Sequence, residues 1–374
     1  FPCPPEVQAP ATLEPVQEQQ DATLPTADPV TGGIATPTDP ATAAVADAPR
    51  VTVQTPELSG TISLLGGRID DLKLTQYHEA IDDSSPQVTL LSPSGTPDAY
   101  FASFGWAAAS GIAADAVPGP DTLWAVEDGE TLTPETPVTL VWDNGAGQIF
   151  RNQISVDDKY MFSVAQSVEN TGTAEVSLYP YGMLRQEGMP SDLQNFFILH
   201  EGLVRMTDGT LEEVKYKKML DFAVDDRYGT NAERQDVTSA GWIGYTDHYW
   251  MTTLIPNQAV PFRSVAKYFP GRDIFQAEAV QDAQTVAPGA TASVTTQLFA
   301  GAKEWETIRD YQAAGVTGFV DSIDWGWFFF LTKPIFWVLH HLNLLIGNMG
   351  FAIIALTFFL KLLVLPLAYK SYVS

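Results

Sequence analysis

The sequence predicts a mostly β protein: a large antiparallel sandwich followed by an amphipathic interface helix and one transmembrane helix. Between residues 50 and 300, short runs with period-two alternation of apolar residues are separated by Gly, Pro, Asn and Asp. Many strands with little helical periodicity are typical of two packed sheets. After Gly301 the apolar period becomes helical, and Gly350 to Ala368 is apolar except for Lys361. This change of period predicts a membrane-associated C-terminal part.

Charge and cysteine content narrow the class of protein. The chain has 374 residues and a formal net charge of -25, carried mainly outside the apolar C-terminal part. An acidic surface repels nucleic-acid phosphates and anionic lipid headgroups, which argues against both as ligands of the β-rich part. Cys3 is the only cysteine, so the sequence contains no internal disulfide.

The first 49 residues are predicted to be a disordered linker. They are rich in Pro, Ala, Thr and acidic residues and have few large apolar side chains to bury. The chain begins without an initiator methionine and ends at Ser374, just after the apolar segment. We therefore expect it to be a fragment of a longer protein.

Residues 50–300 are predicted to form the sandwich. Apolar side chains alternate in 150–156 and in 160–168, and a third run begins at Val176. The sequences Asp157-Asp-Lys and Asn170-Thr-Gly are typical of turns, so these runs predict a meander. Further strand-like runs occur at 51–53, 62–74, 139–142, 241–254 and 293–299.

Residues 301–320 are predicted to be the helical end of this domain, because Trp305, Ile308 and Tyr311 recur at helical spacing. Residues 321–346 are aromatic and apolar but are interrupted by Pro334 and a histidine pair. This composition favours an amphipathic helix in the membrane interface, and a second spanning helix is the alternative. The expected interface anchors are tryptophans, the side chains favoured at the headgroup boundary: Trp325, Trp327 and Trp337.

Residues 347–370 are predicted to span the membrane, and 371–374 to begin the loop that follows. As a helix, 350–368 would be about 28 Å long, which is enough to cross the hydrocarbon core. A lysine at the middle of such a helix costs roughly 2.5–3.5 kcal/mol on insertion scales, so Lys361 is predicted to have a function. It could reach an interface, pair with a carboxylate or line a wet cavity. Lys370 follows more than two turns later, so reaching the helix end would strain the side chain, which favours the cavity.

The residue patterns give little support to an enzyme. None of the five histidines has the spacing of a metal site, and one cysteine cannot build a zinc cluster, so no metal or other cofactor is expected. No phosphate-binding loop, dinucleotide fingerprint or nucleophile elbow is present. His200-Glu201 and Asp247-His248 could each act as base and orienting group, although polar pairs at strand edges or in loops are commoner.

Motifs in the C-terminal part carry a resemblance to a known family: Trp325-Gly-Trp-Phe, Lys333-Pro-Ile-Phe, Gly347-Asn-Met-Gly-Phe-Ala-Ile-Ile and Leu360-Lys-Leu-Leu-Val-Leu-Pro-Leu. They closely resemble the aromatic interface helix and second transmembrane helix of the YidC membrane protein insertases. The acidic β-rich part, which includes Gly241-Trp-Ile-Gly-Tyr-Thr-Asp-His-Tyr-Trp, is similar to the large periplasmic domain of the Gram-negative members.

The resemblance implies a non-enzymatic insertase and chaperone that inserts and helps to fold inner-membrane proteins, alone or with the Sec translocon. Lys361 matches the basic residue of the family's hydrophilic groove. Many bacterial members have arginine there, so lysine keeps the charge but loses the bidentate fork. Gly347, Gly350 and Pro366 are expected to shape the helix. The implied partners are nascent inner-membrane proteins, the Sec translocon and its accessory subunits, membrane lipids and, through parts absent from this chain, the ribosome.

The resemblance also implies a location and suggests a rival hypothesis. The complete protein would have five spanning helices in the bacterial inner membrane, with the sandwich in the periplasm and Lys370 at the cytoplasmic end. The family's sandwich is similar in shape to sugar-binding and sugar-epimerising domains. The rival is therefore a membrane-tethered carbohydrate-binding protein or epimerase that uses His200, His248 and Glu187. An epimerase requires these groups to converge in one pocket, and we expect them to be scattered.

Overall fold

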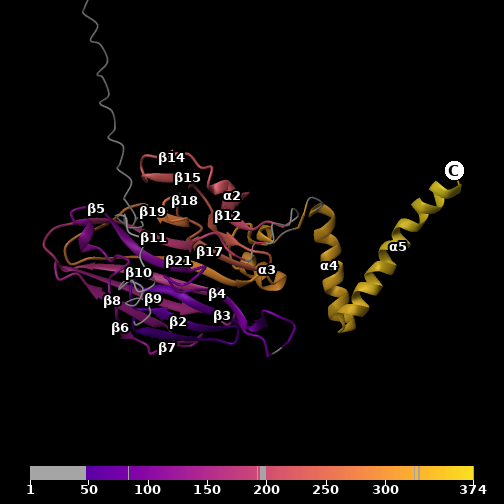
Figure 1. Cartoon of the computed structure of the whole chain (residues 1–374), viewed down its shortest axis with the longest axis horizontal. Helices are drawn as coiled ribbons and strands as arrows, with labels where there is room; N and C mark the ends of the chain where they lie inside the picture. The colour runs from indigo at the N-terminus through magenta and orange to yellow at the C-terminus, as the bar shows by residue number, and fades with distance from the viewer. Residues whose placement is uncertain are drawn as a thin grey trace, which may run out of the picture.

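Two β-sheets pack face to face, and helices follow them at the C-terminal end of the chain (Figure 1). The computed structural model describes residues 48–82, 84–191, 193, 199–323, 325–326 and 329–373. The predicted linker, 1–49, lies outside these residues except for its last two positions, and Trp327 also lies outside them. The sandwich followed by helices confirms the predicted fold class.

The larger sheet has 12 strands, of which β20 pairs only with β11 and β4 pairs only with β3. Its other strands are antiparallel neighbours, except that β1 and β7 run parallel. Its members are β14 (Val224–Asp225), β15 (Thr230–Val237), β18 (Phe262–Phe269), β19 (Ile274–Gln281), β11 (Val176–Glu187), β5 (Tyr100–Ser110), β3 (Arg68–His78), β2 (Leu58–Ser63), β1 (Arg50–Gln54) and β7 (Thr131–Leu132) in spatial order, with β20 (Gln284–Val286) and β4 (Gln87–Leu91) beside them.

The smaller sheet has nine antiparallel strands. In spatial order they are β13 (Thr210–Lys215), β12 (Gly202–Thr207), β16 (Gly241–Thr246), β17 (Trp250–Pro256), β21 (Thr291–Ala302), β10 (Met161–Asn170), β9 (Gln148–Val156), β8 (Val138–Asp143) and β6 (Ala125–Asp128). The helical elements are η1 (Ala114–Ala116), α2 (Tyr216–Met219), α3 (Trp305–Ala313), η2 (Phe319–Ser322), α4 (Phe329–Ile346) and α5 (Met349–Val373).

The predicted meander is only partly correct. The hairpin of β9 and β10 forms as expected, with Val156 opposite Phe162. β11 does not continue it, because this strand pairs with β5 and β19 in the other sheet, while β21 occupies the place beside β10. At the crossing, the side-chain amide of Asn170 donates hydrogen bonds to the carbonyl oxygens of Ala174 and Val286, at 2.8 and 2.9 Å. Alternation showed which side chains face a core, but not which strand lies next to which.

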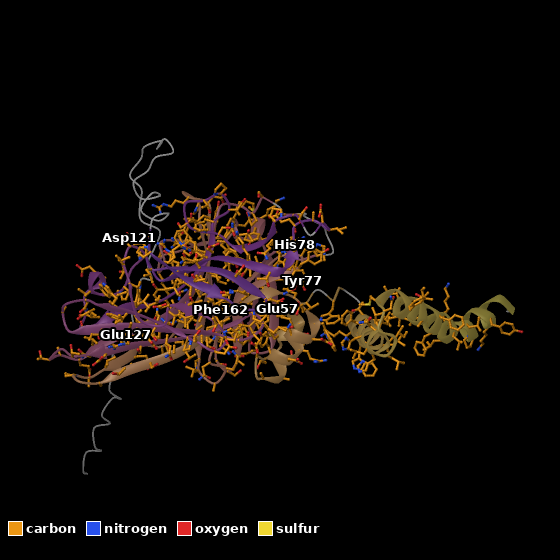
Figure 2. All side chains as sticks on the ribbon, turned by 90° about the horizontal axis from the view of Figure 1, so that it is seen from below. Glu57, Tyr77, His78, Asp121, Glu127 and Phe162 are labelled. Atoms are coloured by element: carbon orange, nitrogen blue, oxygen red, sulfur yellow. The ribbon has the colours of Figure 1, made fainter. Side chains whose placement is uncertain are left out.

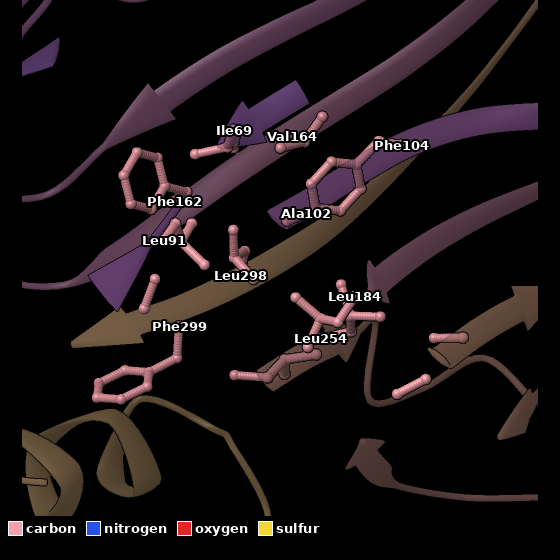
Figure 3. Packing of buried hydrophobic residues seen from close by; sticks show 14 of the residues in the cluster. Ile69, Leu91, Ala102, Phe104, Phe162, Val164, Leu184, Leu254, Leu298 and Phe299 are labelled. Atoms are coloured by element: carbon pink, nitrogen blue, oxygen red, sulfur yellow. The ribbon is translucent and has the colours of Figure 1, made fainter. Parts of the chain in front are cut away.

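The core lies between the sheets and draws large side chains from both of them. Figure 3 shows Phe104 of β5 and Leu184 of β11 near Phe162 of β10 and Leu254 of β17. Phe104 is 4% exposed, and the other three side chains are fully buried. Full burial of an apolar side chain of this size stabilises a fold by about 1.5–3 kcal/mol. The apolar alternation that predicted the strands is thus the inner face of the sandwich.

Buried ionic groups are a feature that the sequence did not reveal. Lys267 of β18 and Glu278 of β19 are 2% and 0% exposed, and their Nζ and Oε1 atoms are 2.7 Å apart. The ammonium also lies 4.4 Å from the ring centroid of Tyr228. Arg205 of β12, fully buried, pairs with Glu233 of β15 and so joins the two sheets. Such pairs compensate charges that would otherwise be buried alone.

The end of the sandwich is joined to the C-terminal helices by aromatic packing. The ring of Trp242 lies 5.6 Å from that of Phe319, and its Nε1 donates a hydrogen bond of 3.0 Å to the carbonyl oxygen of Thr317. Tyr311 of α3 packs against Phe299 of β21 at 5.9 Å. These contacts fix α3 and η2 to the smaller sheet, from which the chain leaves towards α4.

Glu304, just before α3, gathers three hydroxyl groups. Its Oε1 accepts hydrogen bonds from Tyr77 and Tyr160, at 2.7 and 2.9 Å, and its Oε2 accepts one from Thr307 at 2.9 Å. Burial alone would raise the pKa of this carboxyl group. The hydrogen bonds from Tyr77, Thr307 and Tyr160, with the charge of Lys159, outweigh burial and hold the pKa of Glu304 below its ordinary value.

The first prediction concerns the buried ion pair. Glu278→Leu should lower the free energy of unfolding by about 3–5 kcal/mol, because the Lys267 ammonium is then buried without its carboxylate. The double variant Lys267→Met/Glu278→Leu should recover most of this loss. Denaturant unfolding in detergent, followed by tryptophan fluorescence, measures both. A double variant as unstable as the single one would mean that packing, and not charge, causes the loss.

The second prediction concerns pH. Because the folded pKa of Glu304 lies below the unfolded value, its carboxylate stabilises the fold above that value, and the contribution disappears as pH falls through the folded pKa. The difference in unfolding free energy between the wild type and Glu304→Gln should therefore shrink from about pH 6 to about pH 3. The control is Glu213→Gln, at an exposed position of β13. A constant difference for Glu304→Gln would contradict this account.

Candidate functional site

The long C-terminal helix α5 has little protein around it. Phe351, Phe358 and Leu363 are 64%, 70% and 63% exposed, whereas Ala352 and Leu356, near the junction with α4, are buried. Figures 1 and 2 both show α5 extending away from the sandwich. Within the described residues, one helix is long and apolar enough to cross a membrane, with a mean hydropathy of 2.2 over Met349–Pro366. Apolar side chains exposed on this scale require lipid or other helices as cover.

Lys361 is the only charged residue of that apolar window. Its side chain is exposed, and within the part of the chain that the structure describes it makes no hydrogen bond or ion pair. In a hydrocarbon environment an ammonium group needs water, a carboxylate or a headgroup as partner. Lys361 is therefore unfavourable in a helix that only anchors the protein in a membrane.

The turn between α4 and α5 has a glycine where the backbone requires one. Gly347 has a φ of 70°, and its N–H donates a 2.7 Å hydrogen bond to the carbonyl oxygen of Asn343 at the end of α4. The side chain of Asn348 accepts a hydrogen bond of 3.2 Å from the N–H of Phe351 and so caps the start of α5. A Cβ at Gly350 would lie 3.2 Å from the Asn348 Oδ1. Pro366 lies inside α5, which continues to Val373.

α4 docks against α3 through Trp305. The Trp305 ring lies 5.5 Å from the ring of Phe336 and 4.9 Å from that of His340. The Nε2 atom of His340 is 3.0 Å from the Oε1 atom of Glu306, one residue further along α3. α4 is therefore connected to the sandwich by specific side-chain contacts as well as by the chain.

Two predicted interface anchors fall in different surroundings. Trp325 donates a 2.9 Å hydrogen bond from Nε1 to the carbonyl oxygen of Val320, and the ammonium of Lys333 lies 5.7 Å from its ring centroid. Trp337 is 53% exposed, and its ring lies 4.0 Å from that of His341. An exposed indole suits a lipid headgroup region, and the anchoring role stays a prediction.

A cleft of ≈ 1100 Å³ lies in the sandwich, at the end nearest the helices. Figure 2 labels Tyr77 and His78, two of its lining residues. The Tyr245 hydroxyl, in a side chain 2% exposed, has no hydrogen-bond partner among the described residues. Burial raises the pKa of Tyr245 well above its ordinary value, so the hydroxyl stays neutral. The aromatic lining consists of Tyr77, Tyr100, Tyr216, Tyr245, Tyr249 and Trp250.

The groups of the epimerase hypothesis do not share a pocket among the described residues. His248 lines the cleft, with its ring stacked 3.9 Å from that of Tyr249. His200 is buried, with its Nε2 atom 2.8 Å from the carbonyl oxygen of Leu203. Glu187 accepts a 2.9 Å hydrogen bond from the hydroxyl of Ser94. The described residues also contain no cluster of three His, Cys, Asp or Glu side chains suited to a metal ion.

The aromatic cleft was not predicted from the sequence. Tyr245 and Trp250 lie in the run 241–254, which was predicted as strand and forms β16 and β17. Alternation within that run indicates burial, but a core side chain and a cleft wall give the same pattern. The ion pair of Lys333 with Asp321, at 2.6 Å, also has no signature in the sequence.

The family model and the relatives that match this chain point to the same family. Residues 50–338 match the family model described as the YidC periplasmic domain. A protein of Ruegeria sp. (strain TM1040) named "Membrane protein insertase YidC" is 59% identical over 317 residues, which cover 85% of this chain and 52% of that protein. Its namesake in Ruegeria pomeroyi is 52% identical over 381 residues, covering 100% of this chain and 63% of the relative.

Solved structures match about two thirds of this chain, at low sequence identity. A galactose mutarotase related enzyme from Lactobacillus acidophilus has a TM-score of 0.45 and 10% identity, and the match covers 67% of this chain and 97% of that one. A putative aldose 1-epimerase from Escherichia coli K12 has a TM-score of 0.42 and 12% identity, with 67% and 98% covered. Similarity at this level carries no information on activity.

The match to the relatives extends through the apolar helices. The protein of Cereibacter sphaeroides (strain ATCC 17029) is 56% identical over 369 residues, covering 96% of this chain and 59% of that protein. The chain spans about 52–63% of the length of the relatives compared here. With a family model over most of its length and relatives of more than half identity, the chain belongs to the YidC family of membrane protein insertases.

Proposed function

We propose that this chain is part of an insertase that brings polypeptides into the bacterial inner membrane, and that Lys361 supplies the positive charge of its hydrophilic groove. The observation that carries the proposal is Lys361 itself. Membership of the insertase family gives the class of activity, and Lys361 is the solitary, exposed charge of the apolar window Met349–Pro366. A helix that only anchored the sandwich would be more stable in lipid with leucine at this position.

The mechanism is electrostatic and needs no covalent step. At a separation of ~4 Å and an effective dielectric constant of about 20, opposite unit charges attract by about 4 kcal/mol. An acidic or polar stretch of an incoming polypeptide would therefore lose less free energy next to Lys361 than in hydrocarbon. The apolar remainder of the polypeptide then moves into lipid through the hydrophobic effect. The groove lowers the barrier for the polar part only.

The uncovered faces of α5 support a groove with further walls. In this proposal other spanning helices of the complete protein cover part of α5, and lipid covers the rest. The apolar stretch of α4, Phe330–Ile346, is shorter than the span in α5 and carries Pro334, so we place α4 in the membrane interface. The sandwich would lie in the periplasm, with Lys370 at the cytoplasmic end of α5.

The proposed partners follow from the same arrangement. Nascent inner-membrane proteins are the substrates, which the protein inserts and helps to fold, alone or with the Sec translocon. Lipids cover the exposed part of α5. Ribosome contact would use segments outside this chain. Family membership supports these partners, and the aromatic cleft near α4 is a surface from which the sandwich could reach them.

The third prediction tests the charge of Lys361. In a full-length insertase that carries this chain, Lys361→Glu should reduce insertion of a small substrate with an acidic translocated tail by at least about tenfold, because attraction becomes repulsion. Lys361→Arg should retain insertion because it retains the charge. Protease protection of the translocated tail in inverted vesicles measures insertion.

Two matched controls make this test specific. Lys370→Glu changes a lysine of the same helix outside the apolar window Met349–Pro366, and it should have a smaller effect. A substrate with an uncharged tail should be much less sensitive to Lys361→Glu. Unimpaired insertion of the acidic tail by Lys361→Glu would overturn the electrostatic role while leaving the family assignment in place.

A further inference from the structure

A second, smaller pocket lies on the other face of the larger sheet. It has a volume of ≈ 110 Å³. Its lining includes Phe101, Tyr181 and Met183, which form a hydrophobic cluster separate from the core between the sheets. Their sequence neighbours Ala102 and Leu184 belong to that core. Because successive side chains of a strand point to opposite faces, the pocket is on the face of the sheet turned away from the smaller sheet.

Three arginines from separate segments line this pocket. Arg68 begins β3, Arg185 lies near the end of β11, and Arg272 lies in the turn between β18 and β19. The guanidinium carbons of Arg68 and Arg185 are 5.4 and 6.0 Å from the ring centroid of Phe101, so one aromatic ring supports both. Stacking of this kind holds the planar donor groups in fixed orientations.

The donors in the pocket are incompletely used. Among the described residues, none of the three arginines makes an ion pair. Arg68 is 6% exposed; its Nη2 donates a 2.6 Å hydrogen bond to the carbonyl oxygen of Pro120, but its Nη1 is buried without a partner. The indole N–H of Trp124, also in the lining, is buried without a partner among the described residues. Buried donors are normally satisfied, so an acceptor is needed here.

The charge of the pocket is opposite to that of the chain. The three arginines against Asp121, the acidic residue of the lining, leave a net charge of +2, whereas the whole chain carries -25. Asp70, whose Oδ1 pairs with Arg50, and Glu187, which accepts the hydroxyl of Ser94, are not part of the lining and act on Arg68 through their charge only. Burial lowers the pKa of Arg68, but a guanidinium remains charged at neutral pH.

We propose that this arginine pocket binds a small oxyanion, either a carboxylate or a phosphate or sulfate group. Arg68 provides its unpartnered Nη1, and Arg185 provides the N–H groups other than the Nε that donates to Gln276. The Trp124 N–H provides a further donor, and Arg272 adds a third positive charge. Planar guanidinium groups match the spacing of carboxylate and phosphate oxygens. The volume admits one anionic group with few additional atoms, so the ligand is a small ion or a single acidic group of a larger molecule.

Water molecules alone would satisfy the donors of the arginine pocket less completely than an oxyanion would. A water can accept from the Arg68 Nη1 and from Trp124, but it brings no charge to balance buried guanidinium groups. An oxyanion supplies several acceptor sites together with the compensating charge. In a chain with a large excess of carboxylates, a pocket whose lining has three arginines and one carboxylate is best explained by a ligand.

The fourth prediction is a titration of the whole chain in detergent micelles. Sodium phosphate, sulfate and succinate are added at constant ionic strength maintained with sodium chloride, and heat release is measured by calorimetry. Saturable one-site binding in the millimolar range or tighter is expected for at least one of them. Arg185→Gln should weaken this binding at least about tenfold, because it removes a charge-assisted hydrogen bond. Arg272→Gln, which removes the charge of a half-exposed arginine, should also weaken this binding.

The control is Arg234→Gln, which changes an arginine of β15 that pairs with Asp236 away from the pocket lining. It should leave anion binding unchanged. Tighter binding of phosphate or sulfate would assign a tetrahedral ion, and tighter binding of succinate would assign a carboxylate. Binding of no anion above the chloride control would overturn the proposal, and so would wild-type affinity in both Arg185→Gln and Arg272→Gln. Because Arg272 is partly exposed, its variant serves as the test if Arg185→Gln fails to fold.

Discussion

The arrangement of this molecule depends on one constraint: the apolar side chains of α5 are not covered by protein. α5 exposes phenylalanine, leucine and isoleucine over most of its length, and water is a poor solvent for such a surface. Lipid removes the free-energy cost of exposing the apolar side chains of the window to water. For Lys361, lipid instead adds the cost of placing a charge in hydrocarbon. The same helix therefore requires a membrane and a polar site within it. The proposed insertion mechanism uses this combination, since a polar polypeptide segment gains from the lysine and an apolar one gains from the lipid.

The sandwich holds the C-terminal helices at one of its ends. The Trp242–Phe319 contact, the docking of Trp305 on α4 and the ion pair of Lys333 with Asp321 connect the last strand to α4 through successive packed or charged groups. The aromatic cleft is at the same end. A polypeptide that leaves the membrane beside α4 would meet this aromatic cleft, with Tyr249 as its exposed ring, before it reached the bulk of the acidic domain.

Charged side chains have different surroundings on the surface, in the core and in the arginine pocket. Carboxylates dominate the surface and keep the domain away from other anionic surfaces. Buried cations are neutralised by carboxylates, as Lys267 is by Glu278 and Arg205 is by Glu212 and Glu233. The arginine pocket is different, because its guanidinium groups are close together and lack carboxylate partners among the described residues. That difference, rather than the presence of arginine, is what singles out the pocket as a binding site.

The sequence by itself determined the fold class, the helical segments and the singular character of Lys361, because alternation, helical periodicity and the length of an apolar run are local properties. Motifs around Gly347 and Leu360 also carried the family. Tertiary structure decided the rest. It placed β11 in the opposite sheet to β10, paired Lys267 with Glu278, gathered the aromatic rings of the cleft and brought Arg68, Arg185 and Arg272 together from distant parts of the chain. These features depend on which strands become neighbours, and a period-two pattern gives the buried face of a strand without naming its neighbour.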